Sequence, residues 1–132
     1  MTADGRTVTA ILVAAGASRR MGFDKLSHRL PDGRTVLETS LAAFEHHPAV
    51  DQLVLVAGGN LEQCRALAAR CGKPAAVVQG GASRADSVRA GVLAARGQLV
   101  AIHDAARPFV SQAVITRALE AAAQTGAAAP AV

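Results

Sequence analysis

Val8-Thr9-Ala10-Ile11-Leu12-Val13, which runs directly into Ala14-Ala15-Gly16-Ala17-Ser18-Arg19-Arg20-Met21-Gly22, is the stretch that decides the fold class. The first part carries no charge, which is typical of a strand buried on both faces of a parallel sheet. The second part is small, basic and glycine-containing, so its backbone amides can approach an anion closely. A buried strand followed by such a loop indicates an α/β domain whose ligand lies beyond the carboxyl end of the strand.

Apolar runs and helical patterns alternate along the rest of the sequence. Further apolar runs at 53–56, 75–78 and 99–102 alternate with helical patterns that begin at Thr35, Asn60, Ser83 and Ser111 and stop near Pro48, Gly72, Gly97 and Gly126. We therefore predict one domain over residues 1–132, a Rossmann-like, doubly wound and mostly parallel sheet with helices on both faces. Residues 127–132 look like the beginning of another strand, so we expect the sequence to be truncated at its C-terminus.

Composition excludes several classes of protein. The 132 residues are 51% hydrophobic, which argues against disorder, and the net charge of +4 comes from scattered basic residues without a nucleic-acid stripe. Apolar runs are too short for a membrane span, no signal peptide is recognisable, and a cytoplasmic protein is expected. Cys64 and Cys71 fall about two turns apart in one helical pattern, so we expect two buried free thiols.

The loop Ala14–Gly22 is the first candidate site. Arg19 and Arg20 supply forked donors and Lys25 follows closely, which favours an anion-binding loop. The glycine spacing fits neither the dinucleotide fingerprint nor a Walker loop. The alternative is an ordinary turn with two solvated arginines.

A second candidate site follows the third apolar run, in Gly80-Gly81-Ala82-Ser83-Arg84-Ala85-Asp86-Ser87. The glycine pair permits a tight turn with exposed amides, and Ser87 lies one helical turn beyond Ser83. The alternative is a plain helix cap in which Arg84 and Asp86 form a surface pair.

A third candidate site, His103-Asp104-Ala105-Ala106-Arg107-Pro108-Phe109, follows the fourth apolar run. An acid at the carboxyl end of a strand can hold a ribose hydroxyl or a metal ion, and the alternative for Asp104 is a turn-initiating residue. For His103 we favour a packed or hydrogen-bonded strand-end residue over a catalytic base. Because all three candidate sites follow strands of one sheet, they predict a single cleft suited to a nucleoside triphosphate.

Three motifs carry a family resemblance: Ala-Ala-Gly-x-x-x-Arg-Met-Gly at 14–22, Gly-Gly-x-x-Arg-x-Asp-Ser-Val at 80–88 and His-Asp-Ala-Ala-Arg-Pro-Phe at 103–109. Together they resemble the 2-C-methyl-D-erythritol 4-phosphate cytidylyltransferase family, from about Thr9 to Val132. The resemblance implies an enzyme of the non-mevalonate isoprenoid pathway that transfers CMP from CTP to methylerythritol phosphate and releases pyrophosphate. It also implies Mg²⁺ held mainly by the nucleotide phosphates without protein metal ligands, and a homodimer for the full-length protein.

The same resemblance implies the roles of individual residues. Arg20 and Lys25 would be the catalytic cations, and Arg107 would lie on the acceptor side. The CTP site would comprise Ala14, Ala15, Gly16, Ala17, Ser18, Gly81, Ala82, Arg84, Ser87, Asp104 and Ala105. Of these, backbone at Ala14, Ala15, Gly81 and Ala82 would read cytosine, Ser87 would help hold the base, and Asp104 would hold the ribose.

The sequence departs from the family at two points. Lys25 follows Asp24 rather than the proline common in the family, and family members are considerably longer. The absent part would carry the acceptor-binding residues and the dimerisation arm. Three alternatives therefore remain: a ribitol-5-phosphate cytidylyltransferase, another nucleotidyltransferase of the superfamily, or a nucleotide-binding module without turnover because of truncation.

Overall fold

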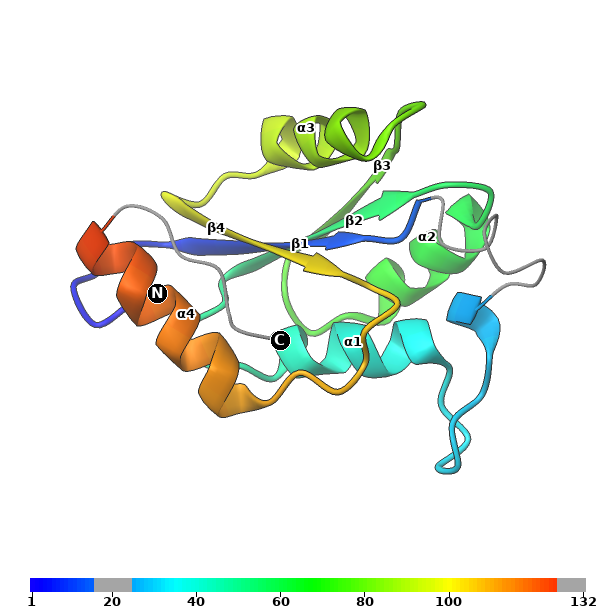
Figure 1. Cartoon of the computed structure of the whole chain (residues 1–132), viewed down its shortest axis with the longest axis horizontal. Helices are drawn as coiled ribbons and strands as arrows, with labels where there is room; N and C mark the ends of the chain where they lie inside the picture. The colour runs from blue at the N-terminus through cyan, green and yellow to red at the C-terminus, as the bar shows by residue number, and fades with distance from the viewer. Residues whose placement is uncertain (16–24, 126–132) are drawn as a thin grey trace.

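A parallel sheet forms the centre of the computed structural model, which describes residues 1–15 and 25–125 (Figure 1). Within these residues its strand order is β3-β2-β1-β4. The strands are β1 (Val8–Val13), β2 (Gln52–Ala57), β3 (Ala75–Gln79) and β4 (Leu99–Asp104). The predicted strands are confirmed, with one change of consequence: β4 continues through Asp104, which the sequence pattern places in the following loop.

The helices begin close to the predicted residues. They are the 3₁₀ helix η1 (Lys25–Ser27), α1 (Val36–Glu45), α2 (Leu61–Arg70), α3 (Arg84–Ala94) and α4 (Gln112–Thr125). The capping box of α1 is formed, with Thr35 and Glu38 each accepting a backbone N–H of the other at 3.1 Å. Ser83 and Ser111 each accept the amide three residues on, so these hydroxyls satisfy donors at the first turns of α3 and α4.

The two ends of α2 fall where the sequence predicts, with Asn60 as the N-cap residue and Arg70 as the last helical residue, but the expected capping contacts are not formed. The Asn60 side chain makes no capping bond, because its Oδ1 accepts the Gly58 N–H at 2.9 Å instead. At the other end the helix stops with Cys71 in an extended conformation, so Gly72 does not supply the left-handed stop that the pattern suggests. The Asn60 side chain thus holds the loop before α2, while its carbonyl accepts the Cys64 N–H in the first turn of the helix.

The helices are divided unequally between the two faces of the sheet. α1, α2 and α4 lie below the sheet in Figure 1 and α3 lies above it. The chain moves outward from β1 to β3 and then returns to β4 on the far side of β1. Crossovers of constant hand put helices on opposite faces when the direction reverses, which explains why α3 alone, among the described helices, covers the upper face.

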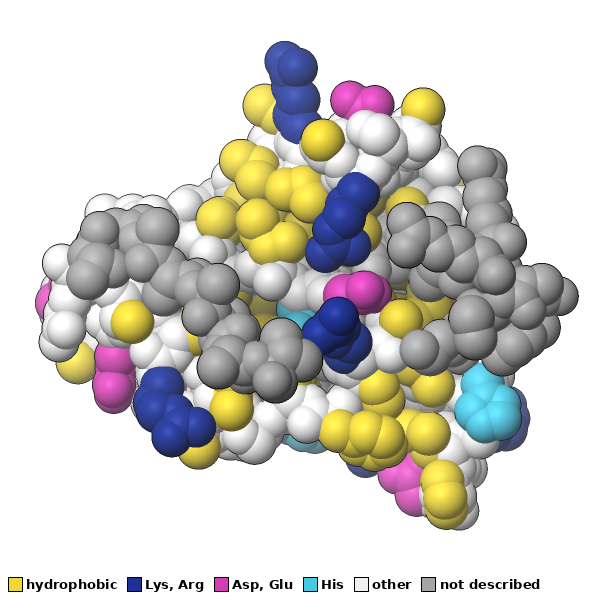
Figure 2. All heavy atoms as spheres, in the orientation of Figure 1, with side chains coloured by type: hydrophobic (Ala, Val, Ile, Leu, Met, Phe, Trp, Pro, Cys, Tyr) yellow, Lys and Arg dark blue, Asp and Glu magenta, His cyan; other side chains and the backbone are white. Residues whose placement is uncertain are grey.

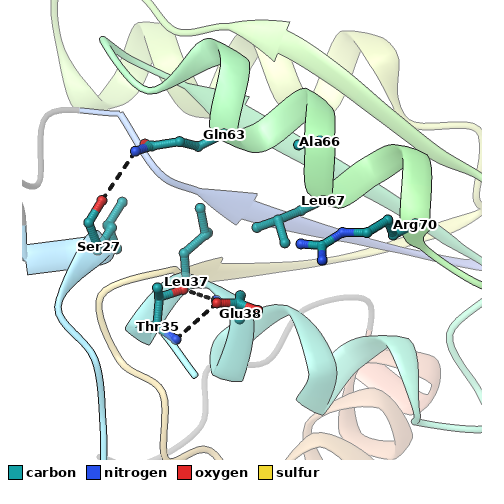
Figure 3. Close-up of a pocket in the computed structure, with 9 residues that line it drawn as sticks. Ser27, Thr35, Leu37, Glu38, Gln63, Ala66, Leu67 and Arg70 are labelled. Atoms are coloured by element: carbon teal, nitrogen blue, oxygen red, sulfur yellow. Dashed lines mark hydrogen bonds between the residues drawn. The ribbon is translucent and has the colours of Figure 1, made fainter. Parts of the chain in front are cut away.

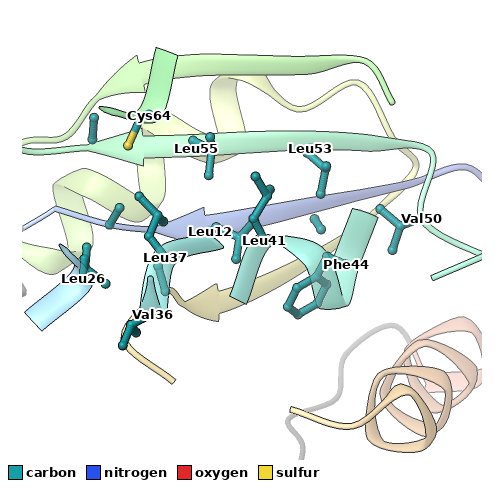
Figure 4. Close-up of a cluster of buried hydrophobic side chains, with 14 of the residues drawn as sticks. Leu12, Leu26, Val36, Leu37, Leu41, Phe44, Val50, Leu53, Leu55 and Cys64 are labelled. Atoms are coloured by element: carbon teal, nitrogen blue, oxygen red, sulfur yellow. The ribbon is translucent and has the colours of Figure 1, made fainter. Parts of the chain in front are cut away.

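Two buried clusters hold these layers together. The larger one packs α1 against the sheet through Leu37, Leu41 and Phe44, which meet Leu12 and Leu55 (Figure 4). The smaller one lies beneath α3 and consists of Ile11, Val13, Val54 and Val56. The prediction of a sheet covered by helices on both faces is confirmed for β1 and β2, whose apolar side chains are buried.

Coverage is incomplete over β4. Val100 and Ile102 lie on the α3 side of the sheet, where their side chains remain 39% and 44% exposed. Figure 2 shows hydrophobic side chains gathered on this surface, between α3 and the sheet. The burial of β4 therefore alternates along the strand, unlike the fully buried strand that its apolar sequence predicts.

The two cysteines are both free thiols, and only Cys64 is fully buried; Cys71 is half-buried, against the prediction. Burial raises the pKa of the Cys64 thiol to about 11, so it is a core residue rather than a reactive group. Across the described part of the chain, no helix has the length and apolar character that crossing a membrane would require.

Candidate active site

The four strands end at nearly the same level. Val13 pairs with Val56 on one side and with Asp104 on the other, and Val56 pairs in turn with Val78. The loops that follow these strands therefore start from one edge of the sheet, as the sequence predicts. This edge is the carboxyl end of every strand, where doubly wound folds bind their ligands.

The direction of winding reverses between β1 and β4. The connection after β1 leads away toward β2, and α3 brings the chain back from β3 to β4. Such a reversal opens a crevice because the two neighbouring loops leave in opposite directions. The loop that begins at Ala14 and the turn that begins at Asp104 flank this point.

The loop after β1 starts from well-anchored backbone. The buried Ala14 donates its N–H to Val56 O at 2.8 Å, and its carbonyl accepts the Asn60 side-chain amide at 3.4 Å. Gly16, Ala17, Ser18 and Arg20 lie outside the described residues. Lys25 is the first residue of η1, which brings its backbone back against α1.

The glycine loop after β3 reaches the loop after β1. A Cβ on Gly80 would lie 2.7 Å from Ala15 Cβ and equally close to Ser87 Oγ, so only glycine fits at this crossing. Gly81 donates its N–H to Ser87 Oγ at 3.2 Å, and a Cβ there would meet Asp86 Cβ at 2.3 Å. The two predicted sites around Ala15 and Gly80 are thus in direct contact.

Ser87 is buried and Ala82 is exposed beside it. The hydroxyl of Ser87 fixes the Gly81 amide from inside the loop, while α3 begins at Arg84 directly after the loop. The amino end of a helix attracts anions, because its first backbone N–H groups point outward and the helix dipole is positive there. This loop can therefore receive a negatively charged ligand or a base edge.

Arg84 and Asp104 bring the second and third predicted sites together. Arg84 Nη1 lies 4.0 Å from Asp104 Oδ2, so Arg84 faces the acid at the end of β4 and not Asp86 as in the surface-pair alternative. Asp104 Oδ1 accepts the Ala106 N–H at 3.0 Å, which is the turn-initiating role that the sequence left open. Oδ2 remains suited to accept a hydroxyl of a ligand.

The turn after Asp104 is held by a network of short bonds. Ala105, fully buried, donates its N–H to Val13 O at 3.0 Å, and Arg107 donates its N–H to Asp104 O at 3.0 Å. Ser40 Oγ donates to Ala105 O at 2.6 Å, and His103 Nε2 lies 2.7 Å from Arg107 O. His103 is thus a packed, hydrogen-bonded strand-end residue, as favoured from the sequence.

Ser40 and Asn60 are the site residues that sequence reasoning missed. Ser40 is a fully buried hydroxyl within the apolar face of α1, between Leu37 and Leu41. A small polar residue at a core position is a usable signal, because it needs a partner once buried. Asn60 looked like an ordinary helix cap, and only its tertiary contact with Ala14 reveals its place beside the site.

The donor set limits how a metal ion could be held. The described residues contain no group of three or more His, Cys, Asp or Glu side chains that could coordinate a metal. Asp104 is the carboxylate at the end of β4, and one of its oxygens already accepts a backbone amide. This donor set suits Mg²⁺ that takes its ligands mainly from phosphates and water.

Two cavities lie outside this constellation. One of about 190 Å³ lies between η1, α1 and α2, where Gln63 reaches Ser27 and Arg70 lies beside Leu67 (Figure 3). Another of about 310 Å³ lies between β4 and α4 and is mostly apolar. Neither is lined by a predicted CTP-binding residue, so the candidate site rests on the convergence of the strand ends rather than on either cavity.

Comparison with known proteins gives a consistent picture. A family model described as 2-C-methyl-D-erythritol 4-phosphate cytidylyltransferase matches residues 8–132. The bifunctional enzyme IspD/IspF of Desulforudis audaxviator is 50% identical over 129 residues, which cover 93% of this chain and 33% of that protein. The 2-C-methyl-D-erythritol 4-phosphate cytidylyltransferase of Symbiobacterium thermophilum is 43% identical over 119 residues, which cover 88% of this chain and 50% of that protein.

A solved structure agrees with the sequence relatives. The 4-diphosphocytidyl-2C-methyl-D-erythritol synthase of Anaerococcus prevotii superposes with a TM-score of 0.75 at 27% identity, covering 89% of this chain and 51% of that one. The chain thus spans one third to one half of the length of these proteins, as the shares of 33%, 50% and 51% indicate.

Proposed function

This chain belongs to the 2-C-methyl-D-erythritol 4-phosphate cytidylyltransferase family, and we propose that it forms the CTP-binding part of an enzyme that transfers CMP to methylerythritol phosphate. The products are 4-diphosphocytidyl-2-C-methyl-D-erythritol and pyrophosphate. The matched family names this acceptor, which favours it over ribitol 5-phosphate.

One observation carries the proposal. The loop after β1, the glycine loop after β3 and the acid at the end of β4 meet where the winding reverses, with Gly80 against Ala15 and Arg84 facing Asp104. A glycine-lined loop, a helix amino end and an acid in one place match the base, phosphates and ribose of a nucleotide.

The proposed nucleotide contacts follow from this placement. Backbone groups at Ala14, Ala15, Gly81 and Ala82 read the cytosine edge, and Ser87 keeps the Gly81 amide in place for it. Asp104 accepts a ribose hydroxyl through Oδ2. Backbone recognition of one base edge discriminates strongly, because a mismatched base leaves buried polar groups unpaired.

The proposed chemistry is in-line attack by the acceptor phosphate on the α-phosphorus of CTP. The bond from the α-phosphorus to the pyrophosphate oxygen breaks as the new P–O bond forms, and charge grows on the α-phosphoryl oxygens. Arg20 and Lys25 stabilise that charge, more in the transition state than in the ground state. Arg107 faces the acceptor phosphate.

Mg²⁺ is proposed to be held mainly by the nucleotide phosphates rather than by side chains of this chain. When bound, the ion neutralises phosphate charge and orients the leaving pyrophosphate. The complete gene product is proposed to be a homodimer in the cytoplasm, and its two free thiols suit that reducing compartment.

Calorimetric titration with a nucleotide panel in Mg²⁺ tests the nucleotide assignment. We expect CTP to bind at least about tenfold more tightly than UTP, ATP or GTP, since each mismatched base leaves a polar backbone group unpaired. Equal affinities across the panel would refute the cytosine-reading loop. Tight binding of another single nucleotide would point to a different nucleotidyltransferase.

A further inference from the structure

The turn that carries Asp104 and Arg107 is fastened from the side of the sheet opposite to Arg84. Strand alternation puts Asp104 on the α3 face and His103 on the α1 face, where His103 pairs across the ladder with Leu12. From that lower face Ser40 Oγ reaches Ala105 O at 2.6 Å and His103 Nε2 lies 2.7 Å from Arg107 O. Both contacts are made to backbone carbonyls within the turn.

The direction of the His103 bond fixes the state of its ring. A carbonyl oxygen only accepts, so Nε2 must carry the hydrogen. Burial lowers the pKa of His103 below its usual value, which favours the neutral ring, and the bond to the Arg107 carbonyl places the hydrogen of that ring on Nε2. The Phe44 ring lies 5.0 Å away, centroid to centroid, and keeps the imidazole in this orientation from α1.

These bonds leave the backbone of the turn little freedom. Arg107 has its N–H held by Asp104 O and its C=O held by His103. Ala105 has its N–H held by Val13 O and its C=O held by Ser40. The backbone that carries the Asp104 and Arg107 side chains is therefore held by two side chains from the α1 face of the sheet.

We propose that Ser40 and His103 are positioning residues, which hold the Asp104–Arg107 turn so that Asp104 meets the nucleotide and Arg107 meets the acceptor. This inference rests on the proposed function for the identity of the two ligands. Ser40, on α1, holds the backbone directly after Asp104. His103 holds the backbone of Arg107, the residue proposed to meet the acceptor. A shift of about 1 Å in such a group can lower turnover by up to about a hundredfold.

Substitution of His103 separates the hydrogen bond from the bulk of the ring. His103→Phe keeps an aromatic ring against Phe44 and removes the donor, whereas His103→Gln retains an N–H at a similar reach. In the complete gene product we expect His103→Phe to lower kcat/KM for methylerythritol phosphate by about tenfold or more, with the Kd of CTP changed less than about threefold. His103→Gln should restore most of the loss, and Ser40→Ala should lower kcat.

His47 supplies the matched control. It is a second histidine on the α1 side, more buried than His103, and its Nε2 lies 2.8 Å from Thr116 Oγ1, beside the amino ends of the strands. His47→Phe should lower the free energy of unfolding as His103→Phe does, but leave kcat and both KM values within about twofold. If the two variants change the kinetics equally, His103 is merely structural and the inference is wrong.

Hydrogen exchange at the turn provides a readout that does not depend on activity. We expect the Ala106 and Arg107 amides to exchange at least about tenfold faster in His103→Phe than in the wild type, and unchanged in His47→Phe. Unchanged exchange in His103→Phe would overturn the positioning role. A wild type without turnover would refute the proposed function, while the exchange result would still decide whether His103 holds the turn.

Discussion

Ser87 joins the core to the proposed nucleotide site through one hydroxyl. Its Oγ accepts the Gly81 N–H at 3.2 Å, and this is the one hydrogen bond of that amide to a described residue. Ser87→Ala should therefore lower CTP affinity about tenfold, because the base-reading loop loses its internal support, and lower the free energy of unfolding by about 1 kcal/mol. Calorimetry and urea denaturation measure the two effects.

Ser83 provides the contrast at the same loop. Its Oγ accepts the Asp86 amide as the cap of α3 and stands at the surface. Ser83→Ala should cost about 1 kcal/mol of stability and leave CTP affinity within about threefold. An equal loss of CTP affinity in both variants would mean that helix stability, and not the Gly81 amide, controls binding.

Single residues also show where sequence reasoning stops. The approach of Gly80 to Ala15 and of Arg84 to Asp104 could be predicted, since strand ends of one parallel sheet share an edge. The hydrogen bonds of Ser40 to Ala105 and of Asn60 to Ala14 could not be predicted. The partners lie far apart in the sequence, and a sequence pattern does not show which distant residues come together.

At the scale of elements, α3 lies unusually close to the sheet. A Cβ on Gly91 would lie 2.5 Å from Ile11 Cγ2 and 3.0 Å from Val56 Cγ2. Gly91→Ala should therefore destabilise the protein by about 1–3 kcal/mol through overpacking, although alanine is the better helix former. Denaturant titration measures this change in the free energy of unfolding.

Leu93 on the same helix is the control. Its side chain is 76% exposed, so Leu93→Ala should change stability by less than about 0.5 kcal/mol. Stabilisation by Gly91→Ala would show that α3 can move away from β1 without loss, contrary to the close packing described here.

The positions of the strands and helices were predicted better than the burial of their side chains. Strand and helix positions followed from apolar runs and from caps such as Thr35 and Ser83, which act locally. The exposure of Val100 and Ile102 did not follow, because an apolar strand gives no sign of which neighbour covers it. The extension of β4 to Asp104 depends on pairing with Val13, which is again a property of the assembled sheet.

At the scale of the whole molecule, two histidines make stability depend on pH. Burial lowers the pKa of His47, assisted by nearby Lys73, and burial also lowers the pKa of His103, both from 6.5. Well above pH 6.5 both rings are neutral in the folded and unfolded states. Below it the unfolded chain binds protons first, so the free energy of unfolding should fall as the pH drops from about 7.5 to about 5.5.

Urea denaturation at several pH values checks this expectation. His47→Gln and His103→Gln should each flatten the dependence, since glutamine does not titrate. Carboxyl groups with lowered pKa, such as Glu38, act in the same direction but below this window, because their ordinary value is 4.5. Stability that rises on acidification from pH 7.5 to 5.5 would contradict the neutral state assigned to both rings.

In the proposed reaction, the catalytic step depends on the Arg20 cation. Arg20→Ala and Arg20→Lys should each lower turnover by about 10²–10³, because a preorganised forked donor on a developing oxyanion contributes about 2.7–4 kcal/mol. CTP affinity should fall much less, since the interaction strengthens in the transition state. Arg19→Ala is the neighbouring control. A greater loss of turnover in Arg19→Ala than in Arg20→Ala would mean that Arg19, and not Arg20, is the catalytic cation.

Pyrophosphate release by the complete gene product, with CTP and methylerythritol phosphate supplied together, tests the central claim most directly. We predict stoichiometric release of pyrophosphate with formation of the diphosphocytidyl product, and at least about tenfold lower kcat/KM when UTP replaces CTP or ribitol 5-phosphate replaces the acceptor. Nucleotide binding without pyrophosphate release would contradict the account and leave a binding module. Release that prefers another nucleotide or acceptor would assign the site to a different transferase.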